Sequence, residues 1–137
     1  MEYDQFENEL KAKYPDLFDG HDIGLWVGKG WQPIIFSLCE QINSHIKFVN
    51  TKPGRTPVKI SVSQIKEKFG GLRFYYDGGD EYISGLVAMA EMWADRTCEI
   101  CGDPGKQRSG GWIKTLCDKH DEERKAEYAK RFGKSAV

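Results

Sequence analysis

The sequence lacks long apolar runs and the signature motifs of the common enzyme classes. No apolar run in its 137 residues approaches the ~20 residues that a membrane-spanning helix needs, and no segment has the layout of a signal peptide. There is no Walker-type phosphate loop, nucleophile elbow or His-Glu-x-x-His motif. None of His21, His45 and His120 is followed two places on by Glu, as the base-deaminase signature requires. These absences predict a protein that is not an enzyme and is not held in a membrane.

Cysteine is also scarce, but three of the four cysteines fall into one informative spacing. Two residues separate Cys98 from Cys101, two separate Cys117 from His120, and fifteen lie between the pairs. A two-residue gap lets a tight turn aim both ligands at one point, and tetrahedral zinc needs two such pairs. Gly102 follows the first pair, where the chain must turn back. We interpret the array as a closed, structural zinc site, with two unrelated pairs or a disulfide as the alternative.

The remaining cysteine, Cys39, lies on the border of an apolar stripe together with His45. Cysteine in such a position is usually buried, so both side chains are interpreted as packed core residues. An unpaired thiol beside a metal site is typical of a reducing compartment. The sequence therefore predicts a cytoplasmic protein.

Length and composition suit one domain with a metal-stabilised appendage. Hydrophobic residues make up 39%, with four Trp, six Tyr and seven Phe, which is enough for a real core. We expect an α+β domain over residues 1–96, with a small antiparallel sheet packed by two or three helices. A zinc-ribbon-like module with a C-terminal helix is expected over residues 97–137.

Apolar periodicity predicts four helices. The first covers residues 2–13, and the second runs from about Trp31 to Val49 with Pro33 tolerated in its first turn. The third begins after an Asp80 cap and ends near Ala94 with Trp93 facing inward. The last is a polar helix over residues 118–131, which Tyr128 and Phe132 are expected to dock. Residues 16–30 are interpreted as an ordered loop around Leu25, Trp26 and Val27.

Residues 58–76 predict a β-hairpin. Gly70-Gly71 suits a two-residue turn, which would place Phe69 opposite Leu72 and Lys68 opposite Arg73. An apolar face then carries Ile65, Phe69, Leu72, Phe74 and Tyr76, and a basic face carries Lys66, Lys68, Arg73 and Tyr75. Val58, Ile60 and Val62 would fall on the basic face unless the strand is interrupted. We therefore expect a bulge near Ser63-Gln64.

The net charge of −1 conceals strong segregation. Residues 1–22 carry seven acids and two lysines, and residues 77–99 carry six acids and one arginine. Residues 51–76 carry six cations and one acid. Such segregation permits a local anion site, and it equally permits pairing of these cations with the chain's own acids or docking to another protein.

Three segments resemble an uncharacterised family of small bacterial and phage proteins. They are Gly30-Trp31 at the start of a helix, the hairpin over residues 64–75, and the two metal-ligand pairs with the residues that flank them over 98–120. The resemblance implies a shared fold with a zinc-ribbon-like end and a prokaryotic or viral origin. It brings no activity, substrate or catalytic residue.

The sequence thus favours a zinc-stabilised, non-enzymatic module that binds a phosphate-bearing ligand. The expected ligand is a nucleic acid or a nucleotide, including a nucleotide signal that the module would sequester. Cations beside an exposed tyrosine can hold phosphate while the ring stacks on a base. The alternative is an inhibitor or adaptor that binds a partner protein, and self-association stays open. The candidate ligand-binding residues are Lys66, Lys68, Arg73, Tyr75, Arg108 and Lys114.

Overall fold

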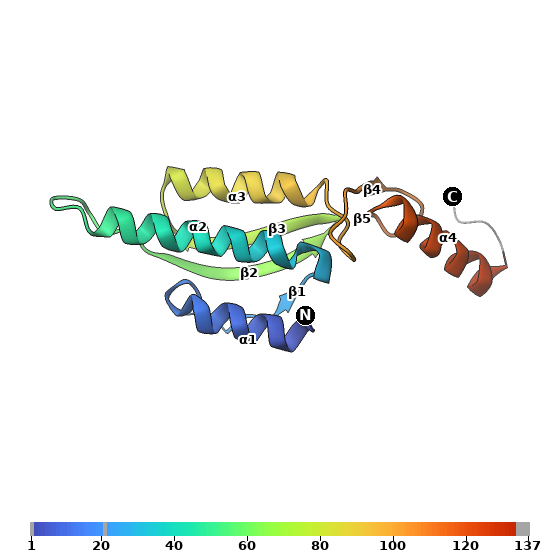
Figure 1. Cartoon of the computed structure of the whole chain (residues 1–137), viewed down its shortest axis with the longest axis horizontal. Coiled ribbons are helices and arrows are strands. Elements are labelled where there is room, and N and C mark those ends of the chain that lie inside the picture. Colours follow the sequence, from blue (N-terminus) through green and yellow to red (C-terminus); the bar gives the residue numbers. More distant parts are fainter. Residues whose placement is uncertain (1, 21, 134–137) are drawn as a thin grey trace.

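The computed structural model describes residues 2–20 and 22–133 and has the predicted α+β class (Figure 1). Residues 134–137, the end of the predicted C-terminal module, lie outside this part. In order, the elements are α1 (Tyr3–Lys13), η1 (Pro15–Leu17), β1 (Leu25–Trp26), η2 (Lys29–Trp31), α2 (Gln32–Asn50), β2 (Ile60–Lys68), β3 (Gly71–Gly78), α3 (Glu81–Ala94), β4 (Lys106–Arg108), β5 (Lys114–Leu116) and α4 (Asp118–Phe132). Within the described residues, none of these helices combines the length and the apolarity that spanning a membrane requires.

The larger sheet has the strand order β1-β2-β3 and is mixed. β2 and β3 are antiparallel as predicted, but β1 runs parallel to β2 and pairs Leu25 with Ile65 and Trp26 with Lys66. The prediction of a purely antiparallel sheet, with residues 16–30 as a loop, is therefore wrong on this point. A strand of two residues is too short to show alternation in the sequence.

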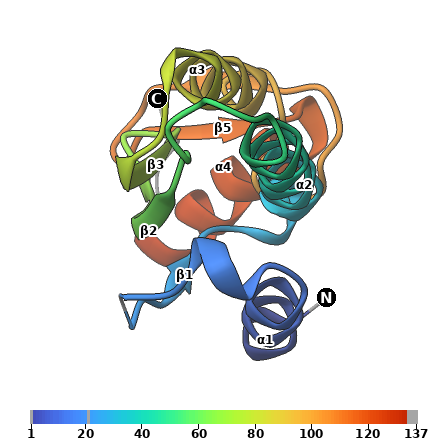
Figure 2. The ribbon, with the colours of Figure 1, turned by 90° about the vertical axis from the view of Figure 1, so that its left-hand side faces the viewer.

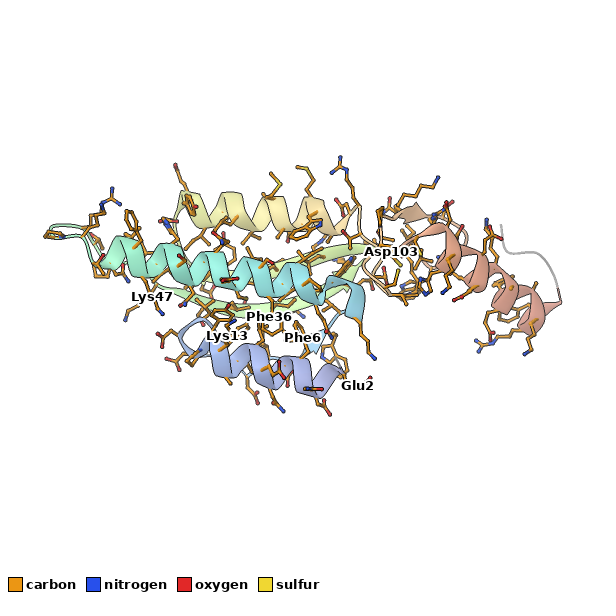
Figure 3. The ribbon with its side chains drawn as sticks, viewed as in Figure 1. Glu2, Phe6, Lys13, Phe36, Lys47 and Asp103 are labelled. Atoms are coloured by element: carbon orange, nitrogen blue, oxygen red, sulfur yellow. The ribbon has the colours of Figure 1, made fainter. Side chains whose placement is uncertain are left out.

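Helices α2 and α3 lie against one side of this sheet (Figure 2). The core between them is apolar and includes Trp31, Ile35, Ile42, Ile65 and Leu72, each fully buried. On the other side of α2, α1 adds Phe6, whose ring meets Phe36 edge-on with 5.2 Å between centroids (Figure 3). Because the helices cover one face only, the opposite face of the sheet is left for solvent.

The hairpin turn lies one residue earlier than predicted. Phe69 and Gly70 are its central residues, with φ of 54° and 78°, and positive φ at both positions is the pattern of a type I′ turn. Lys68 therefore pairs with Gly71 and Lys66 with Arg73, so the predicted Lys68–Arg73 and Phe69–Leu72 pairs are wrong. The observed register places Ile65 opposite Phe74, both buried, and moves Phe69 to the exposed turn.

Apart from Phe69, the assignment of side chains to the two faces survives this shift, because the cross-strand partner of each residue moves by two residues. The predicted bulge is also confirmed, since the pairing shifts between Val62 and Gln64. The extra residue lets Ile60, Val62 and Ile65 all reach the core, although strict alternation would separate them. Cys39 is fully buried as predicted, and burial raises the pKa of its thiol.

Three predicted core contacts are wrong. Trp93 is 48% exposed, because α3 buries a narrow stripe of small and branched residues and leaves the tryptophan at the margin of that stripe. Tyr128 and Phe132 do not dock α4. Both are exposed and contact each other with tilted rings, with 4.7 Å between the ring centroids. Polar contacts link α4 to the residues before it instead. Arg108 pairs with Asp118 and Asp121, and Arg124 donates to the carbonyls of Gly110 and Trp112.

Candidate metal centre

Two short segments bring the four predicted metal ligands together. Cys98 and Cys101 lie on a tight turn after α3, which is closed by hydrogen bonds from the Gly102 N–H to the Cys98 carbonyl (2.9 Å) and from the Cys98 N–H to the Asp103 carbonyl (2.8 Å). Gly102 has φ of 84°, a conformation that glycine adopts without strain. Cys117 is the N-cap of α4, and His120 lies in the first turn of that helix.

The donor atoms of Cys98, Cys101, Cys117 and His120 all lie within 4.8 Å of one another. The Sγ atoms of Cys101 and Cys117 are 3.7 Å apart, and His120 Nδ1 lies 3.6 Å from Cys98 Sγ and 3.2 Å from Cys117 Sγ. Metal–sulfur bonds of about 2.3 Å in a tetrahedral zinc site imply ligand separations of about 3.8 Å. The four side chains are therefore close enough together to hold one metal ion.

Backbone N–H groups favour the thiolate form of Cys98 but do not do so overall for Cys101. Burial opposes ionisation of Cys98, but backbone hydrogen bonds from Cys117, Cys101 and Ile100 outweigh it and lower the pKa of that thiol to about 7. The Asp103 N–H favours a thiolate at Cys101, yet burial and the neighbouring Cys98 and Cys117 thiols raise its pKa to about 11. A cation between the sulfur atoms would offset the repulsion between neighbouring thiolates.

The first cysteine turn also packs closely on the main domain. The Gly30 N–H donates to the Glu99 carbonyl (2.9 Å), and the Trp31 indole N–H donates to the Thr97 carbonyl (2.9 Å). A Cβ on Gly28 or Gly30 would come within 2.0 Å of the carbonyl oxygens of Glu99 and Cys98, respectively. The two glycines are thus required for the close approach between the start of α2 and the metal turn.

The second sheet joins the module to the hairpin turn. Thr115 Oγ1 donates to the Gly70 carbonyl (2.6 Å), and Gln107 Nε2 donates to the Phe69 carbonyl (2.9 Å). Glu99 has a buried carboxylate that accepts from the Thr115 N–H (3.1 Å). These contacts explain why the turn centres on Phe69-Gly70, since both of its carbonyls are used by the module.

Two of the six predicted ligand-binding residues are engaged by internal carboxylates. Lys114 Nζ lies 3.2 Å from Glu99 Oε1. Arg108 pairs with Asp118 at 2.8 Å and with Asp121 at 3.3 Å, which links β4 to the first turns of α4. These side chains neutralise carboxylates around the metal centre.

The other four predicted residues lie together on or beside the uncovered face of the larger sheet. Lys66 and Arg73 are cross-strand neighbours, Tyr75 follows on the same face and is 42% exposed, and Lys68 is exposed next to the turn. Among the described residues, no carboxylate lies within ion-pair distance of Lys66, Lys68 or Arg73.

Sequence reasoning missed one residue of this face, Trp26. Its pairing with Lys66 places the indole on the same side as the cations, and it is 78% exposed. Trp26 also lines a cavity of about 410 Å³ between the sheet and the metal turn, together with Glu67, Glu99 and Lys114. The hint in the sequence was that Trp26 lies between two apolar residues, Leu25 and Val27. The structure buries both of these neighbours and exposes Trp26.

Comparison with protein-family models, with curated proteins and with solved structures gives no match.

Proposed function

We propose that this chain is a zinc-stabilised binding module for a phosphate-bearing ligand, either a nucleic acid or a nucleotide. Zinc is the metal that suits three thiolates and one imidazole in a tetrahedral arrangement. Cys98, Cys101, Cys117 and His120 supply all four ligands of such a site, which is typical of zinc with a structural role. The metal would fix the module against the hairpin, and binding would take place on the sheet.

The observation that carries the proposal is a row of side chains across the three strands. Trp26, Lys66 and Arg73 occupy paired positions on β1, β2 and β3. Like charges directly opposite each other weaken strand pairing by a few tenths of a kcal/mol, up to about 1 kcal/mol. A bound phosphate would supply the missing negative charge and turn this cost into charge-assisted hydrogen bonds.

Aromatic rings flank these cations on the same face. Trp26 lies at the β1 end of the row. Tyr75 lies two residues after Arg73 on β3 and therefore on the same face. Stacking of a base on an exposed aromatic ring contributes about 1–3 kcal/mol. An open sheet face that alternates cations with rings therefore suits a ligand with both phosphate and base.

The proposal is tested by fluorescence anisotropy with a labelled single-stranded oligonucleotide, with a free nucleoside triphosphate as competitor. We expect Lys66→Ala and Arg73→Ala each to weaken binding by about tenfold and to reduce its salt dependence. Both variants should melt at the wild-type temperature or slightly above it, because each relieves the Lys66–Arg73 repulsion. Competition by the triphosphate distinguishes a nucleotide ligand from a longer strand.

Lys47→Ala is the matched control, since this exposed lysine lies on α2, away from the sheet face. Trp26→Ala should weaken binding without changing the salt dependence, because it removes a ring and no charge. The proposal fails if neither probe binds, or if Arg73→Ala lowers the melting temperature and leaves binding unchanged.

A further inference from the structure

The outer face of α3 exposes apolar side chains to solvent. The helix buries Ile83, Val87, Ala90 and Ala94 toward the core. On the opposite side Met89 is 63% exposed and Met92 is 49% exposed, with Tyr82 and Trp93 at the flanks. The outward face of a helix in a globular protein is normally polar, and a contiguous apolar face is typical of an interaction site.

Gly85 also lies on this face. A glycine inside a helix is less favourable than alanine, because it loses more conformational freedom on folding. A Cβ at Gly85 would have no heavy atom within 4 Å, so nothing in the described part of this chain requires a glycine there. A position without a side chain does allow a second helix to approach closely.

The face has the same pattern when it is read from either end. Starting at the first residue, the steps between the outward positions are four, three, one, three and four residues. These positions are Glu81, Gly85, Ala88, Met89 and Met92 on α3 and Arg96 in the turn that follows its C-cap, and all six are exposed. An identical segment running antiparallel, with its twofold axis between Ala88 and Met89, therefore meets matching positions from Glu81 to Arg96.

The residues that meet in this arrangement are complementary. Gly85 lies opposite Met92 of the second copy, and Ala88 lies opposite its Met89, so a large side chain faces a small one at each step. Glu81 lies opposite Arg96 of the second copy at both ends. Within the described residues neither Glu81 nor Arg96 makes an ion pair, so both charges are available.

We infer that the outer face of α3 binds a second copy of this chain through antiparallel α3–α3 packing. The interface is independent of the proposed ligand-binding face, because α3 and that face lie on opposite sides of the sheet (Figure 2). A dimer built in this way presents two copies of the ligand-binding face. A single pair of helices makes a small interface, so the dimer forms in a concentration-dependent manner.

The experiment is sedimentation velocity of the zinc-loaded full chain over a range of concentrations. We expect the wild type to approach twice the 15.6 kDa protomer mass as its concentration rises. Glu81→Arg and Arg96→Glu should each weaken the dimer by about tenfold or more, since each places like charges at both ends of the interface. An equimolar mixture of the two variants should restore association, because each end then pairs Arg with Glu.

Control variants with the same charge changes are Glu40→Arg on α2 and Arg55→Glu in the loop before β2, both exposed. They should associate like the wild type, and Gly85→Leu should associate less than the wild type because it blocks the position of Met92 of the second copy. The inference is overturned if the wild type stays monomeric at all concentrations, if the charge variants associate as well as the controls, or if mixing them restores nothing.

Discussion

Single glycines decide how closely the metal module approaches the rest of the protein. Gly28 and Gly30 bring the start of α2 against the carbonyls of the first cysteine turn, where any side chain would overlap with backbone. Gly85 is the opposite case, a glycine with open space around it. The two kinds of glycine look alike in the sequence, yet substitution should affect stability in opposite directions.

Gly30→Ala should lower the free energy of unfolding by about 1–3 kcal/mol or more, because the new methyl group would overlap with the Cys98 carbonyl and the Gly102 nitrogen. Gly85→Ala is the matched control and should raise the free energy of unfolding by about 0.5–1 kcal/mol. Urea unfolding of zinc-loaded, dilute protein measures both values. A Gly30→Ala variant as stable as the wild type would show that the metal turn can move away from α2.

At the scale of elements, α3 is fixed at its N-terminus by a contact with α2. Asp80 caps α3 by accepting from the Ile83 N–H, and its other oxygen lies 2.7 Å from His45 Nε2. The His45 ring also stacks on Tyr82, with 4.1 Å between centroids. Burial would raise the pKa of Asp80, but hydrogen bonds from His45 and from the backbone outweigh it and hold that pKa below its ordinary value.

Ionised Asp80 therefore stabilises the folded chain above the unfolded carboxyl pKa of about 3.9. This contribution is lost as the pH falls through the lower folded pKa. Asp80→Asn keeps a capping side chain but removes the charge, so it should be less stable than the wild type by about 0.5 kcal/mol at neutral pH. We expect the difference in melting temperature to shrink below about pH 4.

Asp95→Asn, at the exposed C-terminal end of the same helix, is the control and should show no such pH dependence. If the difference between Asp80→Asn and the wild type stays constant down to pH 3, the carboxylate of Asp80 contributes through its capping geometry alone.

At the scale of the whole molecule, the metal centre is connected to both layers of the main domain. The first cysteine turn contacts the start of α2, and β5 contacts the hairpin turn of the larger sheet. Metal removal should therefore affect more than residues 97–133. The far end of α3, which Asp80 caps, makes its contacts with α2 and should be affected least.

Removal of the proposed zinc ion by a chelator should lower the free energy of unfolding, because the free energy of metal binding at such a site is part of the free energy of folding. Hydrogen exchange should show early loss of protection at the Cys98 and Gly102 amides and at the Gly30 amide, whose acceptor is the Glu99 carbonyl. Cys117→Ser should reproduce this pattern, whereas Cys39→Ala should still bind one zinc ion per chain. Metal analysis that finds no zinc in the purified protein would contradict the assignment.

The sequence by itself determined the features that depend on neighbours along the chain. The cysteine and histidine spacing, the Asp80 cap, the apolar stripes of the helices and the bulge in β2 are local patterns, because turns, caps and pleats involve residues a few positions apart. The predicted position of the hairpin turn was wrong by one residue, because that position depends on residues far along the chain. Gly70-Gly71 favours a turn locally, but contacts with Gln107 and Thr115, far along the chain, use the carbonyls of Phe69 and Gly70.

Only the tertiary structure decided which charges remain unpaired. Arg108 and Lys114 have the same charge as Lys66 and Arg73, yet buried or neighbouring carboxylates of Glu99, Asp118 and Asp121 neutralise the first two. Trp26 joins the open face through a parallel strand pair that crosses about forty residues of sequence. Such long-range pairings depend on how layers pack in space, and the pattern of residues along the chain does not encode them directly.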